Sequence, residues 1–206
     1  MSILKQLVFT PKCLICQKLG VNFCLDCTAK AKPFRARSLS EIELSYCVGE
    51  YSGWLRDAII CYKNGDGRYS ELLSHLLSKA LAKLPDYRGA TLIPIPSSPQ
   101  KIKERGFDSM ASLCKGIDSG LEFVKIDATN LFLRKSVTDQ VGLNAAARQA
   151  NLEGAFSARR NLSGTVVIVD DVVTTGATLN SAARTLKYAG AQRVFALALC
   201  GTPQSR

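Results

Sequence analysis

The sequence is poor in residues on which several common kinds of active site depend. It contains one histidine and one tryptophan among 206 residues. With His75 as the only histidine, neither a Ser-His-Asp triad nor a metal centre built from imidazoles is expected. The neighbours of His75 on its predicted helix are the polar Glu71, Ser74 and Ser78, so we expect an exposed side chain without a catalytic role.

Long apolar runs are also missing. No stretch approaches the roughly 18 residues of a membrane span, and the apolar start of the chain lacks the small-residue cleavage site of a secretion signal. With 47% hydrophobic and 21% charged residues, the composition is typical of a globular protein. We therefore expect a cytoplasmic protein without integral membrane association.

Positive charge exceeds negative charge along the chain. Lysine and arginine number 27 against 17 aspartate and glutamate residues, and the formal net charge is +10. Such an excess suits a highly charged anionic ligand, nucleic acid, or both. The basic residues are spread out, and no basic run reaches the length of a localisation signal. Charge alone therefore leaves nucleic-acid binding open.

Cysteine, in contrast, is abundant, and four of the eight cysteines form a pattern. Cys13, Cys16, Cys24 and Cys27 read C-x₂-C, seven residues, C-x₂-C. Each pair can bend around a metal and offer two thiolates, so two pairs complete a tetrahedral site. A redox pair or disulfides are the alternatives, but two pairs in a reducing compartment favour metal. We predict a structural Zn²⁺ site in a small N-terminal domain, residues 1–36, before a larger domain, residues 37–206.

The most informative stretch runs from Thr165 to Thr178. Its first part, Val166 to Val169, is β-branched without alternation, as in a central parallel strand covered on both faces. Two carboxylates follow, then a turn rich in hydroxyl groups. A helix is predicted from Ala177 to Tyr188, with apolar residues on one face.

This stretch has the chemistry of a sugar-phosphate site. Backbone N–H groups at the helix start, the helix dipole and threonine hydroxyls suit a phosphate, and acidic groups suit ribose hydroxyls or hydrated Mg²⁺. The stretch is not a P-loop, because its glycine spacing differs and no Gly-Lys-Ser/Thr follows. The simpler alternative is a strand end followed by a turn whose Asp and Thr residues cap a helix.

The rest of the chain alternates between strand and helix patterns. Predicted strands are Tyr46–Tyr51, Thr91–Ile95, Asn130–Leu133 and Arg193–Cys200; predicted helices are Ser52–Tyr62, Arg68–Leu84 and Lys101–Cys114. The segment Lys30–Ser40 has the character of a linker. Alternation of this kind predicts an α/β fold with a doubly wound parallel sheet and ligands beyond the carboxyl ends of its strands.

Two more segments bear on chemistry. Pro94 to Ser98 stiffens the end of a strand, and Lys101 and Arg105 after it would lie above the ligand edge of the sheet. The polar, cationic segment between Leu133 and Phe156 could close over an anion. Both also have ordinary explanations, a proline-bounded surface turn and an exposed connection. Lys63, in a turn after a predicted helix, could be only a turn charge.

The Asp-Asp and Thr-Thr-Gly-x-Thr order resembles the phosphoribosyl pyrophosphate (PRPP) loop of type I phosphoribosyltransferases. The resemblance implies that Asp170 and Asp171 hold the ribose hydroxyls, with Mg²⁺ nearby, and are the catalytic carboxylates. The 5′-phosphate would be wrapped by the loop, which comprises Thr174, Thr175, Gly176, Ala177 and Thr178. Lys101 and Arg105 would hold the pyrophosphate.

Taken in order, the cysteine pairs, Tyr51 to Asp66, Pro94 to Phe107, Arg134 to Phe156 and the Asp170 loop resemble the competence protein F (ComF) family over nearly the whole chain. The resemblance implies a zinc-binding front domain on a phosphoribosyltransferase-type core. It also implies a role in DNA uptake during natural transformation, with single-stranded DNA and other DNA-uptake proteins as partners. One departure is Asp108, where the family commonly has Asn.

Two other functions stay open at this point. The chain could be a metabolic phosphoribosyltransferase that acts on a purine or pyrimidine base. It could also bind a sugar phosphate as a regulatory sensor without turnover. The acceptor of any transferred phosphoribosyl group is not indicated by the sequence.

Overall fold

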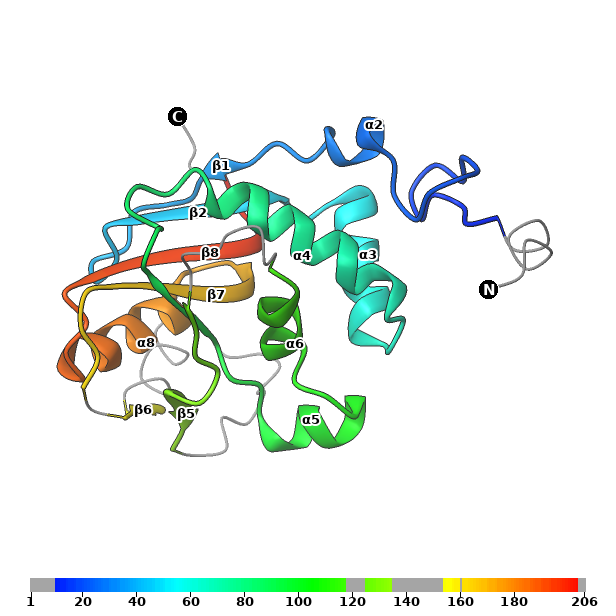
Figure 1. Cartoon of the computed structure of the whole chain (residues 1–206). Helices are drawn as coiled ribbons and strands as arrows, with labels where there is room; N and C mark the ends of the chain where they lie inside the picture. The colour runs from blue at the N-terminus through cyan, green and yellow to red at the C-terminus, as the bar shows by residue number, and fades with distance from the viewer. Residues whose placement is uncertain (1–9, 118–124, 135–153, 160, 204–206) are drawn as a thin grey trace.

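The computed structural model describes residues 10–117, 125–134, 154–159 and 161–203. Its main sheet has six strands in the order β1-β2-β8-β7-β3-β4, and all neighbours are parallel except β1 and β2. The strands are β1 Phe34–Arg35, β2 Leu44–Glu50, β3 Thr91–Pro94, β4 Lys125–Ile126, β7 Thr165–Val173 and β8 Arg193–Gly201. The predicted mostly parallel α/β sheet is confirmed (Figure 1).

Helices cover both faces of this sheet. They are α3 Gly53–Lys63, α4 Arg68–Leu81, α5 Pro99–Arg105, α6 Ser109–Gly116 and α8 Ala177–Tyr188, besides the short α2 Leu25–Thr28. Buried residues of α3, α4 and α6 form one apolar cluster with one face of the sheet, and α8 forms another with the opposite face. Figure 1 shows the same division, with α8 apart from the other three helices. The sheet is therefore doubly wound, as predicted.

Strand β7 shows how the sequence specifies this layering. Val166 and Ile168 belong to the cluster with α8, while Val167 and Val169 belong to the cluster with α3, α4 and α6. All four are fully buried. Successive side chains of a strand point to opposite faces, so a strand covered on both sides needs apolar residues at every position.

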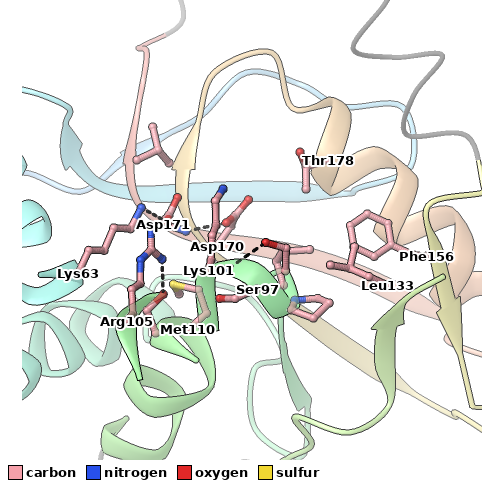
Figure 2. A pocket seen from close by; sticks show the side chains of 15 residues that line it. Lys63, Ser97, Lys101, Arg105, Met110, Leu133, Phe156, Asp170, Asp171 and Thr178 are labelled. Carbon is pink, nitrogen blue, oxygen red and sulfur yellow. Dashed lines mark hydrogen bonds and ion pairs between the residues drawn. The ribbon is translucent and has the colours of Figure 1, made fainter. Parts of the chain in front are cut away.

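The chain reverses its direction of winding between β3 and β7. From β3 it passes through α5 and α6 to β4 at one edge, and from β7 it passes through α8 to β8 on the other side. Neighbouring strands whose connections run in opposite directions leave a crevice at their carboxyl ends, where α/β proteins bind ligands. The pocket drawn in Figure 2 lies at these two strand ends.

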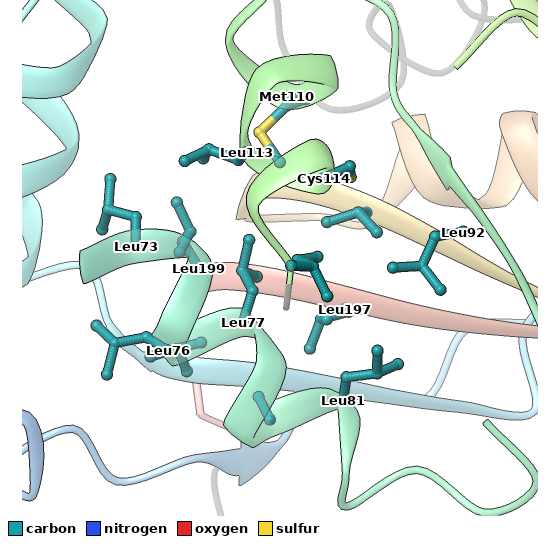
Figure 3. Close-up of a cluster of buried hydrophobic side chains, with 14 of the residues drawn as sticks. Leu73, Leu76, Leu77, Leu81, Leu92, Met110, Leu113, Cys114, Leu197 and Leu199 are labelled. Carbon is teal, nitrogen blue, oxygen red and sulfur yellow. The ribbon is translucent and has the colours of Figure 1, made fainter. Parts of the chain in front are cut away.

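The core under α4 and α6 holds the strand ends in place. Leucines of α4 meet Leu113 of α6 and Leu197 and Leu199 of β8 (Figure 3). The α4 residues of this face are Leu72, Leu73, Leu76, Leu77, Ala80 and Leu81, and all are buried. Each fully buried leucine contributes about 2 kcal/mol of hydrophobic free energy. Polar groups at the sheet edge are thus supported by a closely packed frame.

The predicted single helix Lys101–Cys114 is wrong, because the chain forms two helices there. Gly106 ends α5 with a left-handed φ of 83°. Asp108 then begins α6 as its N-cap, and its carboxylate accepts hydrogen bonds from the backbone N–H groups of Met110 and Ala111. Glycine commonly ends a helix, and aspartate commonly occupies the N-cap of the helix that follows.

Other strand predictions also need correction. The predicted third strand is β5, Leu131–Leu133, and it pairs antiparallel with β6, Phe156–Ala158, in a separate two-stranded sheet. Strand β7 continues through both aspartates to Val173 instead of ending before them. The predicted linker Lys30–Ser40 contains β1, which pairs with the edge strand β2.

His75 is not the exposed residue predicted from its polar neighbours. Its side chain is half-buried, and its ring lies 5.6 Å from the ring of Phe23 in the cysteine-rich segment. Ser74 is buried, and its hydroxyl donates to the carbonyl of Leu113. The polar face of α4 is therefore covered by neighbouring segments at Ser74 and His75, whereas Glu71 is exposed.

Among the helices of the described ranges, none combines the length and apolar composition needed to cross a bilayer.

Candidate functional site

A cavity of about 240 Å³ opens at the carboxyl ends of β3 and β7 (Figure 2). Polar and charged groups line one part of it, and the apolar side chains of Leu133 and Phe156 line another. The remaining lining residues are Lys63, Ile95, Pro96, Ser97, Ser98, Lys101, Arg105, Ser109, Met110, Asp170, Asp171, Val172 and Thr178. The cavity therefore joins the predicted carboxylates to the predicted cations.

The two carboxylates lie at the end of the buried part of β7. Strand alternation turns Asp170 towards the α8 face and Asp171 towards the α3 face. The Asp171 backbone N–H donates to Asp170 Oδ1 at 2.8 Å. Two acidic groups thus face the crevice from one strand at fixed positions.

The environment of Asp170 disfavours its charged form. Burial and the neighbouring charge of Asp171 together raise the pKa of Asp170 to about 7, although the hydrogen bond from the Asp171 backbone N–H and the charges of Lys63 and Lys101 act in the opposite direction. A carboxylic acid with this pKa binds a proton near neutral pH unless a cation or hydroxyl donors arrive. The site is thus prepared for a ligand that brings positive charge or hydrogen-bond donors.

Lys63 forms an ion pair with Asp171 at one side of the cavity. Sequence reasoning left this lysine as a turn charge, yet it ends α3 and reaches the carboxyl end of β7. The signal that could have found it is its position: Leu55, Ala58, Ile59 and Tyr62 bury one face of α3, so the next residue emerges at the sheet edge.

Lys101 and Arg105 line the cavity from α5, as predicted. The helix start is fixed, because Ser98 Oγ accepts a hydrogen bond from the Lys101 backbone N–H at 3.3 Å. At the other end, the Arg105 guanidinium lies 3.5 Å from the Ser109 hydroxyl. Figure 2 shows Lys63 and Arg105 on the side of Asp171, away from Leu133 and Phe156.

Asp108 holds the turn before this cationic helix in place. Its carboxylate accepts hydrogen bonds from the backbone N–H and the hydroxyl of Ser97, at 3.2 Å each, besides capping α6. An asparagine side chain has only one oxygen for these donors. The carboxylate therefore has a clear structural role at this position.

The predicted phosphate loop joins β7 to α8. Thr174 and Thr175 are exposed, and Gly176 begins α8 with a left-handed φ of 78° and no side-chain cap. Thr178 lines the cavity, whereas Thr174, Thr175, Gly176 and Ala177 are not among its lining residues. The structure thus brings one of the five loop residues to the cavity and leaves the others at its margin.

Gly176 also touches a segment from the front of the chain. A Cβ atom built on it would lie 2.2 Å from Leu39 Cδ2. Any larger residue at position 176 would push Leu39 aside and strain the left-handed backbone.

The predicted cationic segment above the cavity lies mostly outside the described residues. Its ends are placed: Leu133 in β5 and Phe156 in β6 face the cavity (Figure 2). The residues from 135 to 153, which include Thr138, Gln140 and Arg148, lie outside them.

Four cysteine thiols meet at the front of the chain, as the spacing predicts. The sulfur atoms of Cys13, Cys16, Cys24 and Cys27 all lie within 4.8 Å of one another. For Cys13, hydrogen bonds from the backbone of Cys16, Ile15 and Cys24 outweigh burial and lower the thiol pKa to about 6. Burial and the neighbouring thiols raise the pKa of Cys27 to about 12. Four adjacent thiols of this kind form a candidate metal site.

The other cysteines are separate from this cluster. Cys47, Cys114 and Cys200 are buried, whereas Cys61 on α3 is half-buried. Burial raises the pKa of Cys47 to about 12 and keeps it a neutral thiol. These residues fill space in the core.

A second cavity of about 270 Å³ lies between the cysteine-rich segment and the start of α3. It is lined by Lys30 and Lys32, by the ring of Trp54, and by Glu50 at the end of β2. This cavity combines positive charge with an aromatic surface, at the same carboxyl edge of the sheet as the first.

Comparison with known proteins agrees with the sequence resemblance. Residues 105–206 match the phosphoribosyl transferase domain. The DNA utilization protein YhgH of Escherichia coli O6:H1 is 32% identical over 143 residues, which cover 66% of this chain and 63% of that protein. Competence protein ComFC of Streptococcus pneumoniae is 26% identical over 72% of this chain and 64% of its own length.

A third relative is competence protein F of Haemophilus influenzae, 31% identical over 54% of this chain and 48% of that protein. The chain thus spans less than two thirds of the length of these curated relatives.

Proposed function

We propose that this chain, which belongs to the ComF family and contains a phosphoribosyl transferase domain, binds PRPP at the carboxyl edge of its sheet and acts in DNA uptake during natural transformation. The observation that carries the PRPP proposal is the cavity at the switch between β3 and β7. Two carboxylates from β7 and cations from α3 and α5 line it together, beside the start of α8. The DNA-uptake role rests on the relatives named for competence and DNA utilization.

Each part of PRPP has a counterpart in this arrangement. We assign the 5′-phosphate to the loop from Thr174 to Thr178, where the N-terminus of α8, whose N-cap residue Gly176 has no side chain, offers backbone N–H groups and positive potential. The ribose hydroxyls are assigned to Asp170 and Asp171. The pyrophosphate is assigned to Lys101 and Arg105.

The carboxylates also fit a magnesium ion. Mg²⁺ prefers oxygen ligands and binds through one or two carboxylates together with substrate phosphates. Asp170 and Asp171 supply such oxygens, and binding of a cation would also relieve the cost of ionising the buried Asp170. When bound, the ion neutralises charge on the pyrophosphate.

If a nucleophile is present, the same residues suit transfer of the phosphoribosyl group. The bond from C1 of the ribose to the pyrophosphate oxygen breaks as the nucleophile attacks C1, and the bonding electrons leave with the pyrophosphate. Positive charge develops on the sugar, and Asp170 and Asp171 stabilise it electrostatically. Lys101 and Arg105 hold the departing pyrophosphate.

The cysteine cluster fits zinc. A tetrahedron with Zn–S bonds of about 2.3 Å has sulfur–sulfur separations of about 3.8 Å. Cys24 Sγ lies 3.8 Å from Cys13 Sγ and 3.7 Å from Cys16 Sγ. We therefore assign structural Zn²⁺ to these thiolates and treat residues 1–36 as a zinc-binding domain in front of a phosphoribosyltransferase-like domain, residues 37–206. Cytoplasmic conditions would keep the thiols reduced.

Single-stranded DNA is the proposed macromolecular partner. The second cavity offers Lys30 and Lys32 for the backbone and Trp54 for a stacked base, the combination that single-strand binding uses. Gel-shift titration at rising salt concentrations tests this contact, since phosphate contacts must weaken as salt rises. Affinity independent of salt would contradict it.

Isothermal titration with PRPP and Mg²⁺ tests the site. We expect saturable binding to the wild type and at least a hundredfold weaker binding to the double variant Asp170→Asn/Asp171→Asn, because charge-assisted hydrogen bonds are worth about 1.5–3 kcal/mol each. Asp57→Asn, on the exposed face of α3, is the matched control and should bind as the wild type does. Equal affinity of the double variant would refute the assignment.

Turnover is a separate question from binding. Release of pyrophosphate from PRPP, assayed with a library of purine and pyrimidine bases, distinguishes a metabolic transferase from a protein that only binds PRPP. Release with one base and not with others would favour the metabolic function over the DNA-uptake role.

A further inference from the structure

The ion pair of Lys63 with Asp171 joins the end of α3 to the end of β7. Both side chains are about three-quarters buried, with exposed fractions of 24% and 26%. An ion pair at this depth is screened less by salt than a pair on the surface. Lys63 is therefore part of the cavity rather than a solvated charge at a helix end.

The backbone around Lys63 is firmly anchored. The preceding residue, Tyr62, is buried, and its hydroxyl donates to the carbonyl of Ser109 at 2.9 Å. Its ring also packs edge-on against Phe107, with centroids 5.4 Å apart. These contacts fix the end of α3 against the start of α6, so the Lys63 side chain starts from a fixed point and only its own stem is free to rotate.

Asp171 has two competing uses. In the structure its carboxylate pairs with the Lys63 ammonium. The proposed function instead needs the same carboxylate for a ribose hydroxyl or for hydrated Mg²⁺. A divalent cation at this position would repel the ammonium strongly at the few ångströms available. When the site fills, Lys63 must therefore leave Asp171.

The described lining of the cavity offers the ammonium another position. Figure 2 shows Arg105 beside Lys63 and Lys101 beside Asp170, and the proposed function puts the pyrophosphate at Lys101 and Arg105. A lysine has a flexible four-carbon stem and three donors, so it can exchange one anionic partner for another without backbone movement. The anion of the ligand thus replaces the carboxylate as its partner.

We propose that Lys63 is a pyrophosphate-binding residue that occupies Asp171 in the empty site and moves to the pyrophosphate when PRPP binds. This inference rests on the proposed function. It makes Lys63 a specificity residue, because a sugar phosphate without pyrophosphate gives the ammonium nothing in exchange for Asp171. The wild type should therefore prefer PRPP to ribose 5-phosphate by more than Lys101 and Arg105 alone would give.

The experiment compares two ligands on two variants. Wild type, Lys63→Met and Lys63→Arg are titrated with PRPP and with ribose 5-phosphate, each with Mg²⁺, by isothermal titration. Methionine keeps most of the apolar stem and removes the charge. We expect Lys63→Met to bind PRPP about 10- to 100-fold more weakly, as for the loss of one charge-assisted contact. Its affinity for ribose 5-phosphate should be unchanged or slightly higher, since Asp171 is released.

Controls separate this role from a structural one. Lys115→Met, on the exposed end of α6, should leave both affinities unchanged. Lys63→Arg keeps the charge and should retain most of the preference for PRPP. If Lys63→Met does not fold, Lys63→Gln replaces it, and thermal melting identifies that case.

The outcomes distinguish this inference from the proposed function. If the wild type binds no PRPP, both are overturned. If the wild type binds PRPP but Lys63→Met weakens PRPP and ribose 5-phosphate equally, Lys63 only positions Asp171, and the present inference alone is overturned. Unchanged affinity of Lys63→Met for PRPP overturns it as well.

Discussion

The cysteine cluster and the cavity at the sheet edge hold their chemical groups in opposite ways. The four thiols at the front of the chain have few buried neighbours besides themselves, with Ile15 packed against them. Leu19 and Leu25 of the same segment are mostly exposed. By contrast, the carboxylates of the cavity follow directly after four fully buried residues of β7.

The two regions therefore differ in what stabilises them. We expect the front segment to depend on its thiol cluster, whereas the carboxylates of the cavity depend on the packed sheet for their positions. A segment with so little apolar core cannot offset the entropy of ordering its chain, so we expect the proposed metal to supply the missing stabilisation. The cavity can tolerate a repulsive pair of carboxylates because the surrounding sheet is stable without them. Changes to the two regions should therefore have opposite effects on stability.

The largest expected effect is a loss of stability in the front segment when one of its four cysteines is replaced. Cys24→Ser removes the thiol that lies within 3.8 Å of both Cys13 and Cys16. Structural zinc contributes on the order of 10 kcal/mol to the folding of small modules. We expect the bound metal to be lost and backbone amides of residues 12–28 to exchange rapidly, as measured by metal analysis and hydrogen exchange.

The matched control is Cys61→Ser, a half-buried cysteine on α3 outside the cluster. It should keep the metal and the protection of the front segment. A Cys24→Ser protein with full protection and no metal would show that the front segment folds by itself.

The second largest expected effect is an increase in stability when Asp170 is replaced. Its pKa is raised from 3.8 to about 7, so the folded protein binds a proton that the unfolded chain has already lost. Stability of the wild type therefore falls as the pH rises from about 4 to 7. Asp170→Asn keeps an oxygen for the Asp171 N–H and avoids this cost, so it should be more stable by roughly 3–4 kcal/mol above pH 7.

Urea unfolding at pH 4 and pH 8 measures this difference, which should be small at the lower pH. Asp127→Asn is the control of opposite sign. Although burial raises the pKa of Asp127, hydrogen bonds from Thr129 and Asn130 outweigh it and hold the pKa below its usual value. Its replacement should destabilise the protein at pH 8. A stability gain of Asp170→Asn that did not depend on pH would rule out the buried charge as its cause.

The smallest expected loss of stability comes from a substitution in the predicted phosphate loop. Gly176→Ala would place a Cβ 2.2 Å from Leu39 Cδ2 at a φ of 78°. Left-handed backbone costs a non-glycine residue about 1–2 kcal/mol, and displacement of Leu39 adds to this. We expect lower thermal stability and weaker PRPP binding.

Gly89→Ala provides a close match, because Gly89 has a φ of 77° and no atom within 4 Å of a built Cβ. It should show the backbone cost alone and leave PRPP binding intact. Equal losses of thermal stability in the two variants would mean that the contact with Leu39 does not contribute to the effect of Gly176→Ala.

Structure was predicted most accurately from the sequence where residues of one type recur at a regular spacing. The β-branched run of β7 is buried on both faces as predicted, and the helix predicted to start at Arg68 is present as α4. The four cysteines also meet as their spacing implied. The break between α5 and α6 was missed although Gly106 and Asp108 mark it, because the apolar pattern continues across them.

Local sequence patterns could not predict which segments, far apart in the chain, come into contact. Nothing in the local sequence of Lys63 indicates Asp171, and their pairing depends on how α3 is placed on the sheet. Likewise, the three-residue strand β5 has too few side chains to show which sheet it joins, and its partner β6 follows much later in the chain.

The contact of β1 with β2 determines where the chain can be divided. Phe34 and Arg35 cover the outer edge of β2, and Ala36 bridges to Pro203 beyond the end of β8. A protein trimmed to residues 37–206 would leave the edge of β2 bare, and a bare edge strand invites pairing with a second copy and aggregation. A shortened protein that starts at Lys32 would keep this edge covered and is the better choice for studying the parallel sheet and its cavity separately.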